Sequence, residues 1–324
     1  MMKIIIKLYP VLLSFFIIFY LFKNIKFGQL INTLNDTNIL FIIFIIVIYS
    51  VSKIINTYRY SQIYKISDKF KLFFVLCYCN LMLSILPFRI GEFSYITNLK
   101  KFFKINLVNR LNGLGLIRIF DMIIIFYLFL IASIYSSAEL SNGFTFNISL
   151  VFTLLLITVA VLVAVFILFR NKIKILIRSV FKNKIFVNKI FNFINNSVIE
   201  LKKLNSKIII ILLASTFAYW LYRIFFGYLI LIILGISITF FNTLFISCII
   251  ISITLIPIKT FANFGIFEAG WSYFLIKLGY ESEIALIYIL KFHLIILLTI
   301  IIYGLIGYFF IRKTNEIRCP SNII

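Results

Sequence analysis

The feature that most constrains this chain is a series of apolar runs, each close to the length of a membrane span. They occupy residues 4–22, 39–58, 111–135, 148–169, 208–234 and 285–311. About 20 consecutive apolar residues cross the hydrocarbon core of a bilayer as a helix. Only 13% of the 324 residues are charged, and mean hydropathy is +1.12, which excludes a soluble domain of this length. We therefore expect an all-α integral membrane protein, a polytopic bundle with about six full spans.

The distribution of Lys and Arg predicts the topology, because cytoplasmic loops retain these residues. Residues 170–207 carry ten basic residues and one acid, whereas residues 136–147 carry no basic residue. We expect a multi-pass protein of the plasma membrane in which the first segment and both termini are cytoplasmic and the second segment is external. Residues 1–324 would form a single membrane domain, in which segment 170–207 joins halves 1–169 and 208–324.

Two further apolar runs, residues 72–87 and 236–257, each end at a proline. The flanks of the first run, residues 59–71 and 89–110, are both basic, so a single crossing would place one of them outside. A re-entrant hairpin that breaks at Pro87 removes this conflict, because proline disfavours helix at the preceding residue. Irregular backbone at membrane depth is tolerated only inside protein or beside a water-filled cavity. The break at Pro87 is therefore expected to line an interior cavity.

The same arrangement of residue types occurs twice. A proline is followed within about a dozen residues by Gly and Glu, as Pro87, Gly91 and Glu92 and again as Pro257, Gly265 and Glu268. Two broken helices of opposite orientation are typical of an inverted-repeat transporter, whose binding site lies where they meet. True internal symmetry and a coincidence of two proline breaks both remain open at this point.

Charged residues inside the apolar runs are the candidate site residues. Arg118 and Asp121 are spaced i, i+3 and share one helix face. One interpretation is a local ion pair that only holds helices together. The other is that Arg118 and Arg89 receive an anionic lipid head group while Asp121 and Glu92 orient the two arginines, because the planar guanidinium suits phosphate.

The remaining polar residues in apolar runs leave similar alternatives. Glu92 and Glu268 either cap the helix that follows each break or take part in proton coupling or contact with a cationic head group. Arg223 either lines a cavity or snorkels to the interface. The lone His293 and the scattered cysteines offer no metal-ligand cluster, so we expect neither a metal nor another cofactor.

Two blocks of sequence resemble the lysylphosphatidylglycerol synthase transmembrane-region family, which is often described as flippase-like. The blocks are "LPFRIGEFSYITNLKKFFKINLVNRLNGLGLIRIFDMIIIF" and "IPIKTFANFGIFEAGWSYFLIKLGY". The second block has "ANFGIFE" where the family usually has more glycine, and Lys291 stands where an Arg is common. The soluble aminoacyl-transferase domain of some members is not found in the sequence. The resemblance therefore implies lipid handling and not lysyl transfer.

These observations predict a flippase-like transporter that moves an anionic phospholipid or a polyisoprenyl-phosphate-linked glycan between leaflets. The expected head-group site consists of Arg89, Glu92, Arg118, Asp121 and Glu268, with no catalytic residue. The alternative is a membrane-embedded enzyme or assembly factor in cell-envelope lipid or glycan synthesis, in which Glu92 or Asp121 would be a general base. The sequence contains no nucleotide-binding loop or nucleophile motif, which favours transport.

The expected partners follow from the same residues. They are membrane lipids with an anionic head group, a second copy of the chain, and a separate synthase or glycosyltransferase. The formal net charge of +22 is distributed as membrane topology requires, and no nucleic-acid-binding module is recognisable. We therefore expect no nucleic-acid partner.

Overall fold

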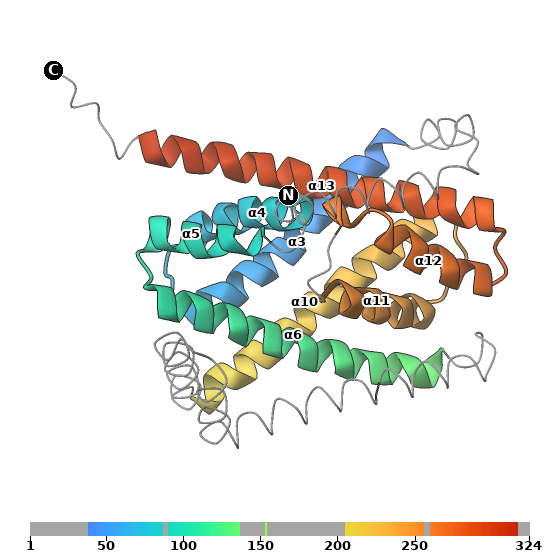
Figure 1. Cartoon of the computed structure of the whole chain (residues 1–324), viewed down its shortest axis with the longest axis horizontal. Helices are drawn as coiled ribbons and strands as arrows, with labels where there is room; N and C mark the ends of the chain where they lie inside the picture. Colours follow the sequence, from blue (N-terminus) through green and yellow to red (C-terminus); the bar gives the residue numbers. More distant parts are fainter. Residues whose placement is uncertain (1–37, 87–89, 137–152, 154–204, 256–259, 317–324) are drawn as a thin grey trace, which may run out of the picture.

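The computed structural model describes residues 38–86, 90–136, 153, 205–255 and 260–316, and these residues form helices without any strand (Figure 1). Four helices within this part are long and apolar enough to cross a membrane. They are α3 (Ile39–Tyr64), α6 (Leu107–Tyr135), α10 (Ser206–Ile233) and α13 (Ser282–Glu316). The predicted all-α fold is confirmed. The expected span 4–22 lies outside the described residues, as do span 148–169 apart from residue 153 and the basic segment 170–207 apart from residues 205–207.

Asparagine side chains fix where three of the long helices begin. The Oδ1 atoms of Asn38, Asn106 and Asn205 accept hydrogen bonds from the backbone N–H groups of the first turns of α3, α6 and α10, at 2.9, 2.8 and 3.3 Å. The first N–H groups of a helix have no partner within the helix, so a capping side chain satisfies them. Each span therefore begins at an asparagine that ends a polar segment.

The first predicted break separates α4 (Lys69–Ile85) from α5 (Glu92–Phe103). Helix α5 folds back along α4, because Gly91 lies against Leu83 while the Ser94 hydroxyl donates to the carbonyl of Cys79 at 3.4 Å. A Cβ atom on Gly91 would lie 2.3 Å from the Leu83 Cα. The close return at the break therefore requires glycine. Pro87 itself lies outside the described residues.

The second break separates α11 (Phe240–Leu255) from α12 (Ile266–Lys277), with a short 3₁₀ turn, η2 (Phe261–Asn263), between them. The backbone leaves the helical region near Gly265, which has a φ of 89°. Helix α12 then runs back along α11: the rings of Phe245 and Phe274 lie 6.2 Å apart, and Gly270 faces Ile250. Both proline-ended runs therefore continue into a shorter helix that returns along the first. Pro257 lies outside the described residues.

The two halves pack through antiparallel helix pairs that correspond to each other. Helices α3 and α10 cross at the centre, α13 and α6 lie at opposite edges, and the pairs α4–α5 and α11–α12 fill the two sides (Figure 1). Helix α13 runs antiparallel to α4, with Phe74 stacked on Phe310 at 4.2 Å. Helix α6 runs antiparallel to α11, with Phe129 stacked on Phe245 at 5.3 Å.

The contact between α4 and α13 corresponds to the contact between α11 and α6. Exchanging α3 with α10, α4 with α11 and α6 with α13 turns the first contact into the second. The central pair α3 and α10 maps onto itself and is also antiparallel, since Tyr49 lies beside Phe226 and Arg59 beside Tyr219. The helix contacts of residues 39–135 and 206–316 therefore correspond pairwise, as an inverted repeat requires, and the inverted repeat itself stays a prediction.

Small residues allow α13 to approach α4 closely. A Cβ atom on Gly307 would lie 2.5 Å from the carbonyl oxygen of Phe74, and one on Gly304 would lie 2.4 Å from the Cβ of Leu81. Helices in a membrane associate by packing of this kind, because lipid tails are as apolar as the side chains. The contact holds the first hairpin against the last helix and so fixes both sides of the region between the breaks.

Candidate functional site

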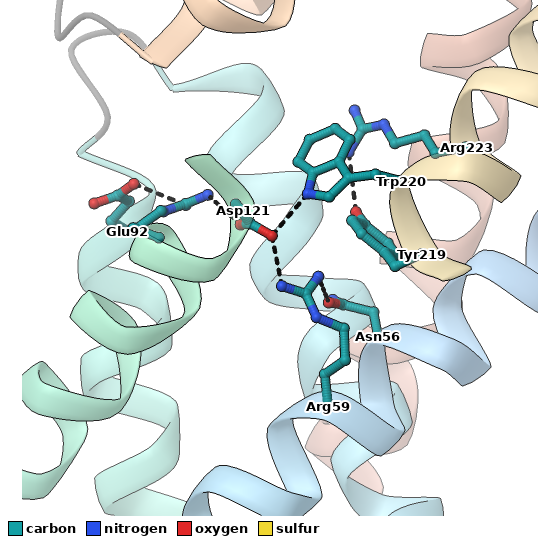
Figure 2. A network of polar contacts seen from close by, with 8 residues as sticks. Asn56, Arg59, Glu92, Asp121, Tyr219, Trp220 and Arg223 are labelled. Carbon is teal, nitrogen blue, oxygen red and sulfur yellow. Dashed lines mark hydrogen bonds and ion pairs between the residues drawn. The ribbon is translucent and has the colours of Figure 1, made fainter. Parts of the chain in front are cut away.

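Asp121 connects three helices at the centre of the bundle (Figure 2). It lies on α6 and is 2% exposed. Its Oδ1 accepts from Arg59 Nη2 of α3 at 2.5 Å and from Trp220 Nε1 of α10 at 2.8 Å. Its Oδ2 lies 3.7 Å from Arg118 Nη1. A buried carboxylate is tolerated when it is paired and hydrogen-bonded in this way.

The position of Arg59 corrects one expectation from the sequence. The sequence predicts that residues 59–71 form a basic flank outside the apolar runs, but α3 continues to Tyr64 and buries Arg59 at 1% exposure. The helix can continue past the apolar run because Asp121 neutralises the guanidinium. The link between α3 and α4 is therefore residues 65–68, and of the four cations in 59–71 only Lys65 lies in it, because Lys69 and Lys71 belong to the first turn of α4.

Arg118 and Glu92 form a second ion pair, between α6 and the first residue of α5. Arg118 Nη2 donates to Glu92 Oε1 at 2.9 Å, and the two side chains are 31% and 33% exposed. The return of the chain after the first break places Glu92 against α6. In contrast to Asp121, this pair is open on one side.

A cavity of about 210 Å³ lies at that open side, between the two breaks. The end of α4 and the start of α5 contribute Ser84 and Glu92, and η2 contributes Asn263. Its polar lining further includes Asn80, Arg118, Arg223, Ser247 and His293, and its aromatic lining is Tyr49, Trp220, Phe226, Phe267, Trp271 and Phe292. The cavity therefore combines charged groups with an apolar, aromatic wall, as small-ligand sites do.

The sequence left open whether Arg223 lines a cavity or snorkels to the membrane interface. In the structure Arg223 lies on α10 and lines this cavity. Its Nη1 donates to the Tyr219 hydroxyl at 3.0 Å, and its guanidinium lies 5.3 Å from the centre of the Trp220 ring. Figure 2 shows Arg223 and Asp121 on opposite sides of Trp220. The indole therefore separates the buried ion pairs from a cation that faces the cavity.

Glu268 both caps α12 and pairs with His293 of α13. Its Oε2 accepts from the backbone N–H of Gly265 at 2.7 Å, and its Oε1 lies 2.5 Å from His293 Nδ1. The His293 ring lies near the rings of Phe264 and Phe267, at 4.8 and 4.6 Å between centroids. His293 lines the cavity, whereas Glu268 is buried behind it.

The five predicted head-group residues occupy three kinds of position. Glu92 and Arg118 line the cavity, Asp121 and Glu268 contact lining residues from behind, and Arg89 lies outside the described residues. Of the predicted break residues, Gly91 and Gly265 adjoin the two short helices that return from the breaks.

Sequence reasoning missed Arg59 and Lys53, which are buried cations of α3 beside this site. Lys53 of α3 is 4% exposed, and its Nζ lies 4.7 Å from the centre of the Tyr49 ring. It falls within the predicted span 39–58, where a lone Lys in an apolar run was a signal. The described residues contain no group of three His, Cys, Asp or Glu side chains placed to hold a metal ion.

A bundle of long apolar helices, in which two broken helices enclose a charged cavity, defines this chain as a polytopic membrane protein. Residues 7–304 match the family described as lysylphosphatidylglycerol synthase TM region, and the chain belongs to this family. Membership places it among membrane proteins of cell-envelope lipid synthesis or transport. No curated protein and no solved structure matches the chain significantly.

Proposed function

We propose that this protein is a flippase-like transporter that moves an anionic phospholipid or a polyisoprenyl-phosphate-linked glycan between leaflets of the plasma membrane. The observation that carries the proposal is the half-exposed pair of Arg118 and Glu92 in a cavity between two broken helices. Ionisable groups within membrane spans commonly mark substrate pathways. Helix breaks at the interface of two repeats are where transporters of this architecture bind their substrates.

The chemistry of the cavity fits a lipid head group. Arg118 and Arg223 both line it and offer two guanidiniums, which bind phosphate oxygens through charge-assisted hydrogen bonds. Glu92 and Asp121 orient Arg118 and balance its charge when no lipid is bound. The head group would cross within this cavity while the acyl or isoprenyl chains stay in the surrounding lipid.

Transport by the purified protein in vesicles tests the proposal. Fluorescent phosphatidylglycerol and a fluorescent polyisoprenyl phosphate are incorporated separately, and movement between leaflets is followed by bleaching of the outer leaflet. Arg118→Ala and Glu92→Gln should abolish movement, because each removes one half of the exposed ion pair. Lys100→Gln is the matched control, since Lys100 is an exposed cation of α5 that does not line the cavity.

Expression and elution in size-exclusion chromatography should be unchanged in all three variants. If Arg118→Ala and Glu92→Gln move lipid at the unmutated rate, these charges are structural and the proposal is wrong. If the unmutated protein moves neither lipid but converts one of them to a product, the membrane-embedded enzyme is the correct alternative.

A further inference from the structure

The charges around the cavity do not balance. A group of four cations from α3, α6 and α10 lies in or behind the lining of the cavity. Arg118 and Arg223 line it, Arg59 shares Asp121 with Arg118, and Lys53 lies over the ring of the lining residue Tyr49. Within the part of the chain that the structure describes, the carboxylates of this group are Glu92 and Asp121. The group therefore carries an excess of two positive charges in the middle of an apolar bundle.

The two carboxylates are already engaged by the other two cations. Asp121 lies between Arg59 and Arg118, and Glu92 pairs with Arg118. Lys53 and Arg223 are held by aromatic side chains and contact no carboxylate among the described residues. Lys53 lies over the Tyr49 ring, and Arg223 lies over Trp220 and donates to the Tyr219 hydroxyl. Aromatic faces and hydroxyls attract a cation but do not neutralise it.

The opposite wall of the cavity does not remove this excess when His293 is protonated. Glu268 and His293 then form a neutral pair, and the second Glu268 oxygen is occupied by the N–H of Gly265. When His293 is neutral, the Glu268 charge reduces the excess to one. The site therefore attracts anions in both states, and it attracts them more strongly when His293 carries its proton.

The cations that carry the excess charge face the cavity and not the apolar exterior of the bundle. Arg118 on α6 and Arg223 on α10 both line the cavity, and Tyr49, which holds Lys53, lines it too. Uncompensated charge in a membrane interior is costly, so an anion bound in the cavity is stabilised by all three cations. With His293 protonated, an anion with two charges matches the excess, whereas one with a single charge leaves half of it uncompensated.

We propose that the cavity takes a phosphate head group with two negative charges, as in a lipid phosphomonoester or diphosphate, in preference to a phosphodiester with one. This inference rests on the proposed function and narrows its substrate class. It favours a glycan linked through a polyisoprenyl diphosphate over phosphatidylglycerol, and also over a glycan linked through a single phosphate, because the latter two are phosphodiesters with one charge. A phosphomonoester carries about −1.5 to −2 charges near pH 7.

The two tryptophans provide a direct measurement. The chain contains only Trp220 and Trp271, and both line the cavity, so intrinsic fluorescence reports its occupancy. The full chain in an uncharged detergent is titrated with dihexanoyl phosphatidate, dihexanoyl phosphatidylglycerol and dihexanoyl phosphatidylcholine, which share their acyl chains and differ in head-group charge. We expect phosphatidate to bind roughly ten- to a hundredfold more tightly than phosphatidylglycerol, the range of one charge-assisted contact.

Variants test whether the excess charge causes this preference. Arg223→Gln removes the lining cation that contacts no carboxylate in the described part of the chain. It should reduce the preference for phosphatidate to about threefold or less, which is below the contribution of one charge-assisted contact. Lys100→Gln removes an exposed cation of α5 outside the cavity and should keep the full preference. Inorganic pyrophosphate, titrated in parallel, should bind more weakly than phosphatidate because it lacks the apolar chains.

The possible outcomes distinguish failure of the charge preference from failure of the proposed function. If phosphatidylglycerol binds as tightly as phosphatidate, the charge preference is wrong while the proposed function stands. If Arg223→Gln keeps the full preference, the excess charge is not its cause and the inference is also wrong. If pyrophosphate binds as tightly as phosphatidate, or if no lipid changes the fluorescence, the cavity is not a lipid site and the proposed function fails with it.

Discussion

Glu268 lies 2.5 Å from His293, and this pair occupies the place in the second half of the protein that Glu92 and Arg118 occupy in the first. Each carboxylate lies in the first turn of the short helix after a break, and each base lies on the long helix that follows. Within each pair the two partners are a similar distance apart in sequence: 25 residues between Glu268 and His293, and 26 between Glu92 and Arg118. Both bases line the same cavity, so the two halves present equivalent acid–base pairs to it.

The buried pair in the second half should respond strongly to the loss of one partner. His293→Leu leaves the Glu268 carboxylate without its basic partner at 3% side-chain exposure. Breaking a buried ion pair in this way costs about 3–5 kcal/mol. Adding Glu268→Gln should recover part of that loss, because the amide keeps the hydrogen bond from Gly265 and removes the charge. Thermal unfolding in detergent measures both variants, and equal unfolding temperatures for the single and double variants would contradict a charged pair.

Close packing between α4 and α13 gives a second prediction. Gly307→Ala places a methyl group 2.5 Å from the backbone carbonyl of Phe74, so the two helices must move apart, at a cost of about 1–3 kcal/mol. Gly115→Ala is the matched control, because nothing lies within 4 Å of its Cβ position and alanine favours the helix by up to about 1 kcal/mol. We expect the unfolding temperature to fall for the first variant and to stay level or rise for the second. A fall for both variants would mean that local helix geometry, and not the α4–α13 contact, is responsible.

The parts of the fold that the sequence predicted are those set by local residues. Apolar run length and the two prolines predicted the long helices and the breaks, since span length and loss of backbone hydrogen bonding act within a few residues. The spacing of Arg118 and Asp121 likewise placed them on one helix face. The main partners of Asp121 could not be predicted this way, because Arg59 and Trp220 are 62 and 99 residues away in sequence.

One missed residue did leave a signal in the sequence. His293 was considered only as a metal ligand, and that role was rejected because no second His or Cys lies near it in the sequence. Its spacing from Glu268 nearly equals the spacing of Arg118 from Glu92, the acid–base pair of the first half. Comparing the two halves position by position would have indicated His293 as the equivalent of Arg118. Internal symmetry is therefore the information that single-residue reasoning left unused.

The topology inferred from charge remains a prediction. Ten basic residues in segment 170–207 and none in segment 136–147 place the first inside and the second outside. In a variant with all four cysteines replaced, Asn142→Cys should react with an impermeant thiol reagent in intact cells, whereas Ile185→Cys should react only after lysis. Labelling of position 185 in intact cells would overturn the predicted orientation.

The first hairpin predicts that its two ends emerge on the same side of the membrane. Asp68 caps the start of α4, Lys104 follows the end of α5, and both are exposed. Because α5 returns along α4 from Gly91 onward, these ends lie together, and the basic residues around them favour the cytoplasm. Asp68→Cys and Lys104→Cys, each in the cysteine-free background, should therefore both be protected in intact cells and both react after lysis. The external control Asn142→Cys shows that the reagent reaches the outer surface. Protection of only one of the two positions would mean that residues 72–87 cross the membrane as an ordinary span.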